Sequence, residues 1–161
     1  TNRTPRVTTP TEREIVLTRT FAAGRRRVFE AFSQPALLAR WLLGPPGWSM
    51  VVCDIDLRVG GAYRYVWRHV NGNQIGVGGV FREVVEPERI VSTERFDEAW
   101  YPGQALVTMA LAEQAGETRL THTLCYESRE ARDGVLAGAM EQGLAAGYER
   151  LDALLASKLP G

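Results

Sequence analysis

A long helical pattern closes this sequence, and it follows a run of segments that alternate like β-strands. Over residues 128–159, apolar side chains recur at steps of three or four, so they share one side of a helix. Ser128 is a good N-cap, Glu130 places negative charge in the first turn, and Lys158 and Pro160 mark the end. A helix of this length can cross a whole small domain. The strands before it need one apolar face covered, so the helix and the strands are predicted to pack together.

Four glycines fall inside this helical pattern, although each costs roughly 1 kcal/mol relative to alanine in a helix interior. They are Gly134, Gly138, Gly143 and Gly147. One interpretation is close packing of the helix backbone on the sheet. The other is a groove left open beneath the helix for a ligand. The two are compatible along one helix, so the glycines alone do not decide between them.

The strand-like segments come first, interrupted by two short helical segments. Residues 12–21 alternate between apolar and polar side chains, which predicts a strand. Residues 25–32 and 35–42 have helical spacing, and Pro35 suits a helix start because its missing N–H costs little there. Short turns then join the later strands, which predicts antiparallel pairing. These later strands are expected at 50–57, 63–68, 74–85, 89–96, 104–113 and 117–126.

This order of elements predicts an α+β fold. A curved antiparallel sheet of six to seven strands would wrap around the long C-terminal helix, with two short helices after the first strand. One face of such a sheet can be solvated, as the alternation indicates. A chain of 161 residues is expected to form one domain. We place that domain at 12–159 and expect a flexible tail at 1–11, where Thr, Pro and Arg dominate.

Charge and composition exclude several classes of partner. The 19 basic and 19 acidic side chains balance, so no basic excess suggests nucleic acid. No apolar run approaches the ~20 residues of a membrane span, and no signal-peptide pattern opens the sequence. We therefore expect a cytoplasmic protein without a membrane span. Cys53 and Cys125 are isolated, which favours two buried free thiols over a disulfide framework.

Most catalytic and cofactor signatures are missing from the sequence. Ser49 lacks the second glycine of a GxSxG nucleophile elbow. Two histidines, His69 and His122, are too few for a His-rich metal site. The glycines at 76–79 are followed by a strand and by no Lys-Ser/Thr pair, which argues against phosphate binding. We expect neither a metal nor another cofactor.

Two titratable residues are weak candidates for catalysis. Alternation puts His122 on the apolar face of the last strand, where it is either a satisfied core histidine or a polar anchor or general acid–base group in a cavity. Glu94 lies in a strand whose orientation stays open, because glycines in the preceding strand permit a register change. Facing inward, its carboxylate would be costly to bury unpaired and would be a functional candidate. Facing outward, it is a solvated charge.

Aromatic side chains gather in the middle of the sequence, with Tyr63, Tyr65 and Trp67 on one strand face. They form either a plain core or the wall of a small-molecule cavity. The second interpretation has some support, because one helix on a strongly curved sheet rarely fills the space beneath it. The candidate ligand-binding residues are Trp41, Tyr63, Tyr65, Trp67, Phe81, His122, Met140, Leu144 and Tyr148.

Several short motifs occur in a fixed order along the chain. They are TRTF at 18–21, VFEAF at 28–32, Pro35 with Arg40-Trp41, DIDLRVGG at 54–61, PERIV at 87–91 and TRLT at 118–121. Together they resemble the bacterial family related to the activator of the heat-shock-protein-ninety ATPase, over roughly residues 12–159. The resemblance implies the helix-grip fold of the START, polyketide-cyclase and birch-allergen-like superfamily. In that superfamily a hydrophobic cavity lies between the curved sheet and the C-terminal helix.

Three functions fit this sequence. The first is a soluble protein that binds a small hydrophobic or aromatic molecule beneath the C-terminal helix. The second is an enzyme of the polyketide cyclase or dehydratase type, which would use the same cavity with His122 or Glu94 as a proton shuttle. The third is a chaperone partner or stress-response interaction module, which predicts a filled core and an exposed apolar patch. A homodimer is compatible with the sequence, but no residue specifies one.

Overall fold

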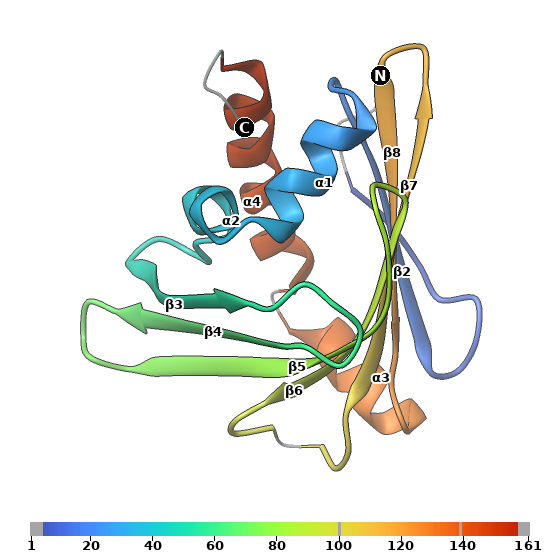
Figure 1. The fold of residues 1–161 in the computed structure, drawn as a ribbon. Helices are drawn as coiled ribbons and strands as arrows, with labels where there is room; N and C mark the ends of the chain where they lie inside the picture. Colours follow the sequence, from blue (N-terminus) through green and yellow to red (C-terminus); the bar gives the residue numbers. More distant parts are fainter. Residues whose placement is uncertain (1–4, 100, 139, 158–161) are drawn as a thin grey trace.

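Figure 1 shows the fold in a computed structural model that describes residues 5–99, 101–138 and 140–157, with the backbone alone at 140–142. Within these residues, eight strands form one antiparallel sheet in the order β1-β2-β8-β7-β6-β5-β4-β3. The predicted α+β class is confirmed, and the sheet has one strand more than the upper predicted number. The strands are β1 (Arg6–Thr8), β2 (Glu14–Phe21), β3 (Trp48–Ile55), β4 (Ala62–His69), β5 (Gln74–Val85), β6 (Arg89–Phe96), β7 (Ala105–Gln114) and β8 (Glu117–Cys125).

The additional strand, β1, lies inside the segment predicted as a tail. It pairs antiparallel with β2, from Arg6 opposite Thr18 to Thr8 opposite Val16. A strand of three residues is too short to show a clear alternation of side chains, which is why the sequence pattern did not reveal it. β1 therefore forms one edge of the sheet, and β3 forms the other.

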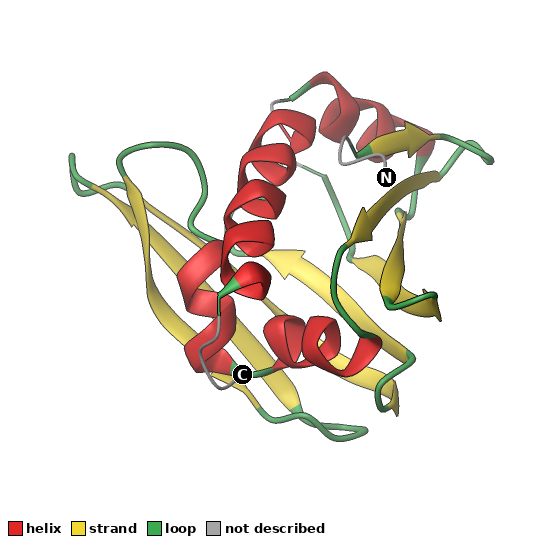
Figure 2. Cartoon of the chain, turned by 90° about the horizontal axis from the view of Figure 1, so that it is seen from above, coloured by secondary structure: helices red, strands yellow, loops and turns green. Residues whose placement is uncertain are grey.

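The sheet bends strongly, and the helices lie on one side of the bend. In Figure 1, β3, β4 and β5 cross the view, whereas β2 and β8 run nearly along its height. A register shift between Phe81 and Glu83 in β5 is the kind of irregularity that increases local twist. Figure 2 shows the helices (red) gathered on the concave side of the bent sheet (yellow). They are α1 (Arg25–Ser33), α2 (Pro35–Trp41), α3 (Arg129–Ala137) and α4 (Met140–Ala156).

The long C-terminal helix predicted from periodicity is in fact two helices. α3 begins after Ser128, whose hydroxyl accepts a hydrogen bond from the Ala131 N–H at 3.0 Å, as the predicted N-cap requires. It ends at Gly138, where the backbone is extended, and α4 begins at Met140. The apolar spacing continues across this break, so periodicity alone did not reveal it. Glycine has low helix propensity, which makes Gly138 a favourable place for the interruption.

The C-terminal half of α4 packs into a solid core with α1, α2, β2 and β8. Phe21, Phe29 and Leu151 are at most 1 % exposed there. Trp41 joins the two short helices, because its indole N–H donates to the Ala31 carbonyl at 2.9 Å. Burying each large apolar side chain contributes about 1.5–3 kcal/mol, so this end of the molecule fixes the position of the helices.

Polar contacts also hold α4 in place. Arg19 on β2 donates two hydrogen bonds to the Asp152 carboxylate on α4, at 2.6 Å each. Arg150 on α4 donates to the carbonyls of Trp41 and Gly44 at the end of α2. All of these contacts lie in the second half of α4, and the side chains described in its first half, from residue 143 on, make no comparable polar contact with the sheet.

Neither a membrane span nor a metal centre is found in the described part of the chain. No helix there is long and apolar enough to cross a membrane. No group of three or more His, Cys, Asp or Glu side chains among the same residues could hold a metal ion. Cys53 and Cys125 are half-buried free thiols.

Candidate functional site

A cavity of about 1140 Å³ lies between the concave side of the sheet and the helices. Its wall includes side chains from β4, β5, β6 and β8, from the loop after α2, and from both C-terminal helices. Small-molecule sites usually enclose about 300–1,000 Å³, so the space is large enough for a drug-sized ligand. Gln74, Asp97 and Glu98 are exposed members of the wall and mark the side on which the cavity opens.

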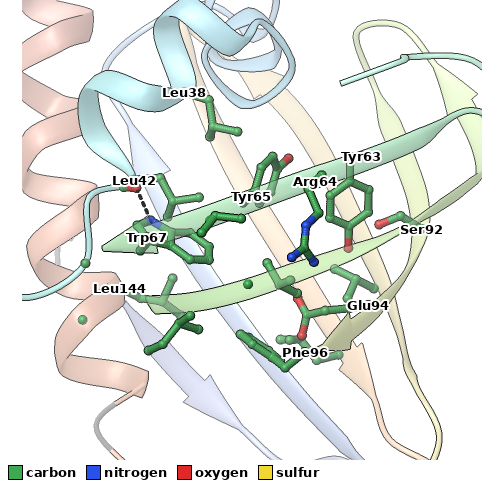
Figure 3. A pocket seen from close by; sticks show the side chains of 18 of the residues that line it. Leu38, Leu42, Tyr63, Arg64, Tyr65, Trp67, Ser92, Glu94, Phe96 and Leu144 are labelled. Carbon is green, nitrogen blue, oxygen red and sulfur yellow. Dashed lines mark hydrogen bonds between the residues drawn. The ribbon is translucent and has the colours of Figure 1, made fainter. Parts of the chain in front are cut away.

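The aromatic residues singled out from the sequence surround this cavity. Tyr63, Tyr65 and Trp67 project from β4 to the same side, as alternation along a strand requires (Figure 3). The side chain of Met140, another predicted wall residue, lies outside the described residues. The other predicted wall residues all line the cavity: Trp41, Tyr63, Tyr65, Trp67, Phe81, His122, Leu144 and Tyr148.

The aromatic side chains of β4 form a continuous row, and two of their three polar groups are hydrogen-bonded. The ring centroids of Tyr63 and Tyr65 are 5.0 Å apart, and those of Tyr65 and Trp67 are 6.0 Å apart. The Tyr63 hydroxyl donates to the Thr93 carbonyl at 2.6 Å, and the Trp67 indole N–H donates to the Leu42 carbonyl at 2.8 Å (Figure 3). Because these two rings have their donors bonded to the backbone, they present mainly apolar surface to the cavity.

Glu94 is a half-buried carboxyl residue in this aromatic wall. Ser92, Glu94 and Phe96 alternate onto the cavity side of β6 (Figure 3). Unbroken pairing with β7, which places Glu94 opposite Ala105, fixes this orientation and settles the question that the sequence left open. Burial raises the pKa of Glu94 to about 7, and no hydrogen bond or neighbouring charge in the described residues offsets that shift. The carboxyl group is therefore close to half ionised at neutral pH.

Four tyrosines of the cavity wall lie close enough to Glu94 for its charge to affect their pKa values, and only two of them were predicted from the sequence as wall residues. Burial raises the pKa of all four hydroxyls, and the Glu94 charge adds a smaller contribution at each. Tyr126 was missed as a site residue even though it alternates with His122 on one face. Tyr101 lies in the loop after β6, where no periodicity predicts its direction. The four are Tyr63, Tyr65, Tyr101 and Tyr126.

His122 occupies a different part of the wall. Burial lowers its pKa to about 4, so its imidazole is neutral at pH 7. Its Nδ1 atom and the Tyr148 hydroxyl are buried without a hydrogen-bond partner among the described residues. His122 pairs with Met109, whose partner Ile90 lies four positions from Glu94 on β6. With about 4.8 Å between strands and about 3.3 Å per residue, His122 and Glu94 are roughly 16 Å apart along the sheet. This separation along the sheet argues against a proton shuttle made of the two side chains together.

The helix glycines support both interpretations, at different positions. A Cβ atom on Gly147 would lie 3.7 Å from Trp41, so α4 packs closely on α2 there. A Cβ atom on Gly143 would meet nothing within 4 Å, and Gly143 lines the cavity together with Gly138 and Gly134. The first half of α4 thus borders open space, whereas the second half is packed.

One family model and several solved structures resemble this chain. Residues 22–156 match the family model described as Activator of Hsp90 ATPase homolog 1-like protein. A crystal structure of a protein from Rhodobacter sphaeroides has 33% identity and a TM-score of 0.90, covering 95% of this chain and 98% of its own. A crystal structure from Chromobacterium violaceum has 31% identity and a TM-score of 0.76, covering 90% and 99% respectively. One from Mycobacterium smegmatis has 27% identity and a TM-score of 0.79, covering 96% and 100%. No curated protein matches the sequence.

Proposed function

This chain belongs to the family of Activator of Hsp90 ATPase homolog 1-like proteins, and from that premise we propose that it binds a small hydrophobic or aromatic molecule in its cavity. The observation that supports the proposal is the cavity itself, about 1140 Å³ with a wall that is mostly apolar and aromatic. Open space of this kind leaves side chains without packing partners and lowers stability. A bound apolar molecule restores those contacts, and burying its surface contributes ~25 cal/mol per Å².

The same observation supports ligand binding over a pure interaction module. An interaction module predicts a core filled by its own side chains and an apolar patch on the outside. Here the open space is inside, and its wall carries the β4 row of Tyr63, Tyr65 and Trp67. The interior cavity therefore favours the binding of a small molecule.

A fluorescent dye tests this proposal directly. N-phenyl-1-naphthylamine is neutral, has two aromatic units and becomes brighter in apolar surroundings. We expect it to bind the wild-type protein, and we expect Gly143→Trp to weaken binding at least tenfold, because the new indole enters the open space beside α4. Failure of the dye and of other neutral aromatic probes to bind the wild type would contradict the proposal.

A matched variant controls for the introduced tryptophan. Ala153 lies on the same helix, is exposed, and is not part of the cavity wall. Ala153→Trp should keep the wild-type affinity for the dye, and thermal unfolding should show that both variants remain folded. Equal loss of binding in the two variants would show that the effect of Gly143→Trp does not arise inside the cavity.

Glu94 supports a second candidate function, an enzyme of the cyclase or dehydratase type. A carboxyl group with a pKa of about 7 can both give and take a proton near neutral pH. His122 lies two strands and four residues away from Glu94 in the sheet and has a pKa lowered to about 4, so the chemistry would depend on Glu94. Turnover of polyketide-like compounds should change with pH around 7 and should be lost in Glu94→Gln. Turnover that is unchanged in this variant contradicts the assignment.

A further inference from the structure

We infer that the molecule bound in this cavity carries a positively charged amine or quaternary ammonium group, which lies against Glu94 and the tyrosine rings around it. The inference rests on the proposed function and adds the chemical class of the ligand. Its first support is the position of Glu94, which faces the cavity from β6 without a charged or hydrogen-bonded partner among the described residues. Burying an ionised carboxylate in this way is costly unless a cation accompanies it. A cationic ligand group provides that partner, whereas a purely apolar ligand leaves the carboxylate unpaired.

The rings around Glu94 suit the same group. The face of an aromatic ring carries negative charge density, and several rings around one site form the cages that recognise quaternary ammonium groups. Tyr63 and Tyr65 lie on β4, two strands from β6 in the sheet, whereas Tyr101 lies in the loop after β6 and Tyr126 directly follows β8. The centroids of the last two rings are 5.7 Å apart in an edge-to-face contact. The site therefore combines one carboxylate with aromatic surfaces on more than one side.

The other charges in the described wall favour a cation over an anion. They belong to Arg64, Asp97 and Glu98. Arg64 donates to both carboxylate oxygens of Asp97 at 2.6 Å each, so this pair is neutral as a unit. What remains is the acidic Glu94 inside and Glu98 at the opening. A fatty acid or another carboxylate would meet like charge, whereas an ammonium group would meet opposite charge.

Glu94 is also the wall group whose charge changes near neutral pH. The pKa of His122 is lowered to about 4 by burial, and that of Asp97 is lowered by its hydrogen bonds with Arg64, so neither changes charge between pH 6 and pH 8.5. With a pKa of about 7, Glu94 is about one-tenth ionised at pH 6 and almost fully ionised at pH 8.5. Cation affinity should therefore rise about tenfold over this range. The tyrosines stay neutral because burial raises the pKa of each: Tyr63, Tyr65, Tyr101 and Tyr126.

Two probes of the same shape test the inference. One is 4-phenylbutyltrimethylammonium, whose charge does not depend on pH, and the other is the neutral analogue with a tert-butyl group in place of trimethylammonium. Calorimetric titrations at pH 8.5 should show the ammonium probe binding at least tenfold more tightly. At pH 6 most of that preference should disappear, while the neutral probe binds equally at both pH values. Equal affinities for the two probes at pH 8.5 would overturn the inference but leave the proposed function intact.

Variants then assign the preference to one side chain. Glu94→Gln keeps nearly the same shape without the charge, so it should lose both the ammonium preference and its pH dependence while still binding the neutral probe. Glu149→Gln removes one charge from an exposed position on α4 outside the wall and should behave like the wild type. A preference that survives in Glu94→Gln contradicts the inference. If that variant does not fold, the wild-type pH profile decides, because a pH-independent preference also contradicts it. If neither probe binds, both the inference and the proposed function fail.

Discussion

The two halves of α4 border two different interiors. Beside its C-terminal half, Leu151 and Leu155 pack against β2, β8 and α1 in a core whose large side chains are almost fully buried. Beside its N-terminal half, Gly143 and Leu144 face the cavity of about 1140 Å³. Tyr148 belongs to both regions, since it lines the cavity and is 1 % exposed. One helix thus seals one end of the sheet and leaves the other end open.

This difference shows where the stability for an open site comes from. A cavity lowers the stability of the folded state, because the side chains that line it lack packing partners. The rest of the protein therefore has to hold the cavity wall in place. The solid end does so with buried aromatic side chains and with the pair of Arg19 and Asp152. The wall of the hollow end is a paired sheet, whose backbone hydrogen bonds do not require the space beneath it to be filled. Substitutions at the two ends should therefore differ in their effect on stability and on binding.

The largest difference is expected between two tryptophans with the same kind of hydrogen bond. Trp41 and Trp67 both line the cavity and each donate an indole N–H to a backbone carbonyl, but Trp41 is 1 % exposed and belongs to the buried core, whereas Trp67 is half-buried. Trp41→Ala should lower the free energy of unfolding by about 3–5 kcal/mol, and Trp67→Ala by about half as much. Denaturation with urea measures both values. Equal losses would mean that the two ends are packed alike.

The next largest effect is expected at the ion pair of Arg19 and Asp152, which holds α4 at the solid end. Asp152→Asn leaves the buried Arg19 guanidinium without its opposite charge and should lower the free energy of unfolding by about 3 kcal/mol. Glu83→Gln removes the carboxylate of the exposed pair with Arg89 and should cost at most about 1 kcal/mol. The comparison uses the same denaturation experiment. Similar losses in the two variants would show that the buried pair has no special role in holding α4.

The elements of the fold could be predicted from the sequence because their periodicities are local. Alternation identified the strands from β2 to β8, and the spacing of apolar residues identified the helices. The missed features were those that local spacing cannot specify. Residues 6–8 are too few for a pattern, and only their pairing with β2 makes them a strand. The break at Gly138 occurs within an uninterrupted apolar spacing, so it depends on how α3 and α4 pack against the rest of the molecule.

The cavity wall was predictable to the same extent as the strands that carry it. Tyr63, Tyr65 and Trp67 share a face because side chains alternate along β4, and this required no tertiary information. The direction of Glu94 depended on its pairing with β7, which the sequence did not specify. Tyr101 lies in a loop, where no rule of alternation applies. The size of the cavity depends on where α4 lies, and a sequence pattern does not determine that position.

A smaller effect on stability comes from Glu94 and His122, whose titrations change the free energy of unfolding in opposite directions. The pKa of Glu94 rises on folding from 4.5 to about 7, so the folded state binds more protons in that window and stability falls as pH rises through it. The pKa of His122 falls on folding from 6.5 to about 4, so the unfolded state binds more protons and stability rises with pH. Between pH 4.5 and pH 6.5 the two contributions offset each other.

Glu94→Gln separates these two contributions. The free energy of unfolding of the wild type minus that of the variant should fall by on the order of 2 kcal/mol between pH 4.5 and pH 8. Urea denaturation of both proteins across this range measures the difference, in which all other titrating groups cancel. Because the carboxyl group faces a cavity open to solvent, we expect less than the full 1.36 kcal/mol per pKa unit. A difference that does not change with pH would show that Glu94 is as well solvated as in the unfolded chain.

The smallest effect is expected at two glycines of α4, Gly143 beside the cavity and Gly147 beside Trp41. Gly143→Ala and Gly147→Ala should each raise the free energy of unfolding by up to about 1 kcal/mol, because alanine has higher helix propensity and neither Cβ atom meets a clash. A leucine distinguishes the positions. Gly143→Leu should keep most of the gain, because its side chain enters open space, whereas Gly147→Leu should lose it by overpacking against Trp41. Equal stability of the two leucine variants would mean that α4 packs no more closely at 147 than at 143. The contrast between the sealed and open halves of the helix would then have no energetic basis.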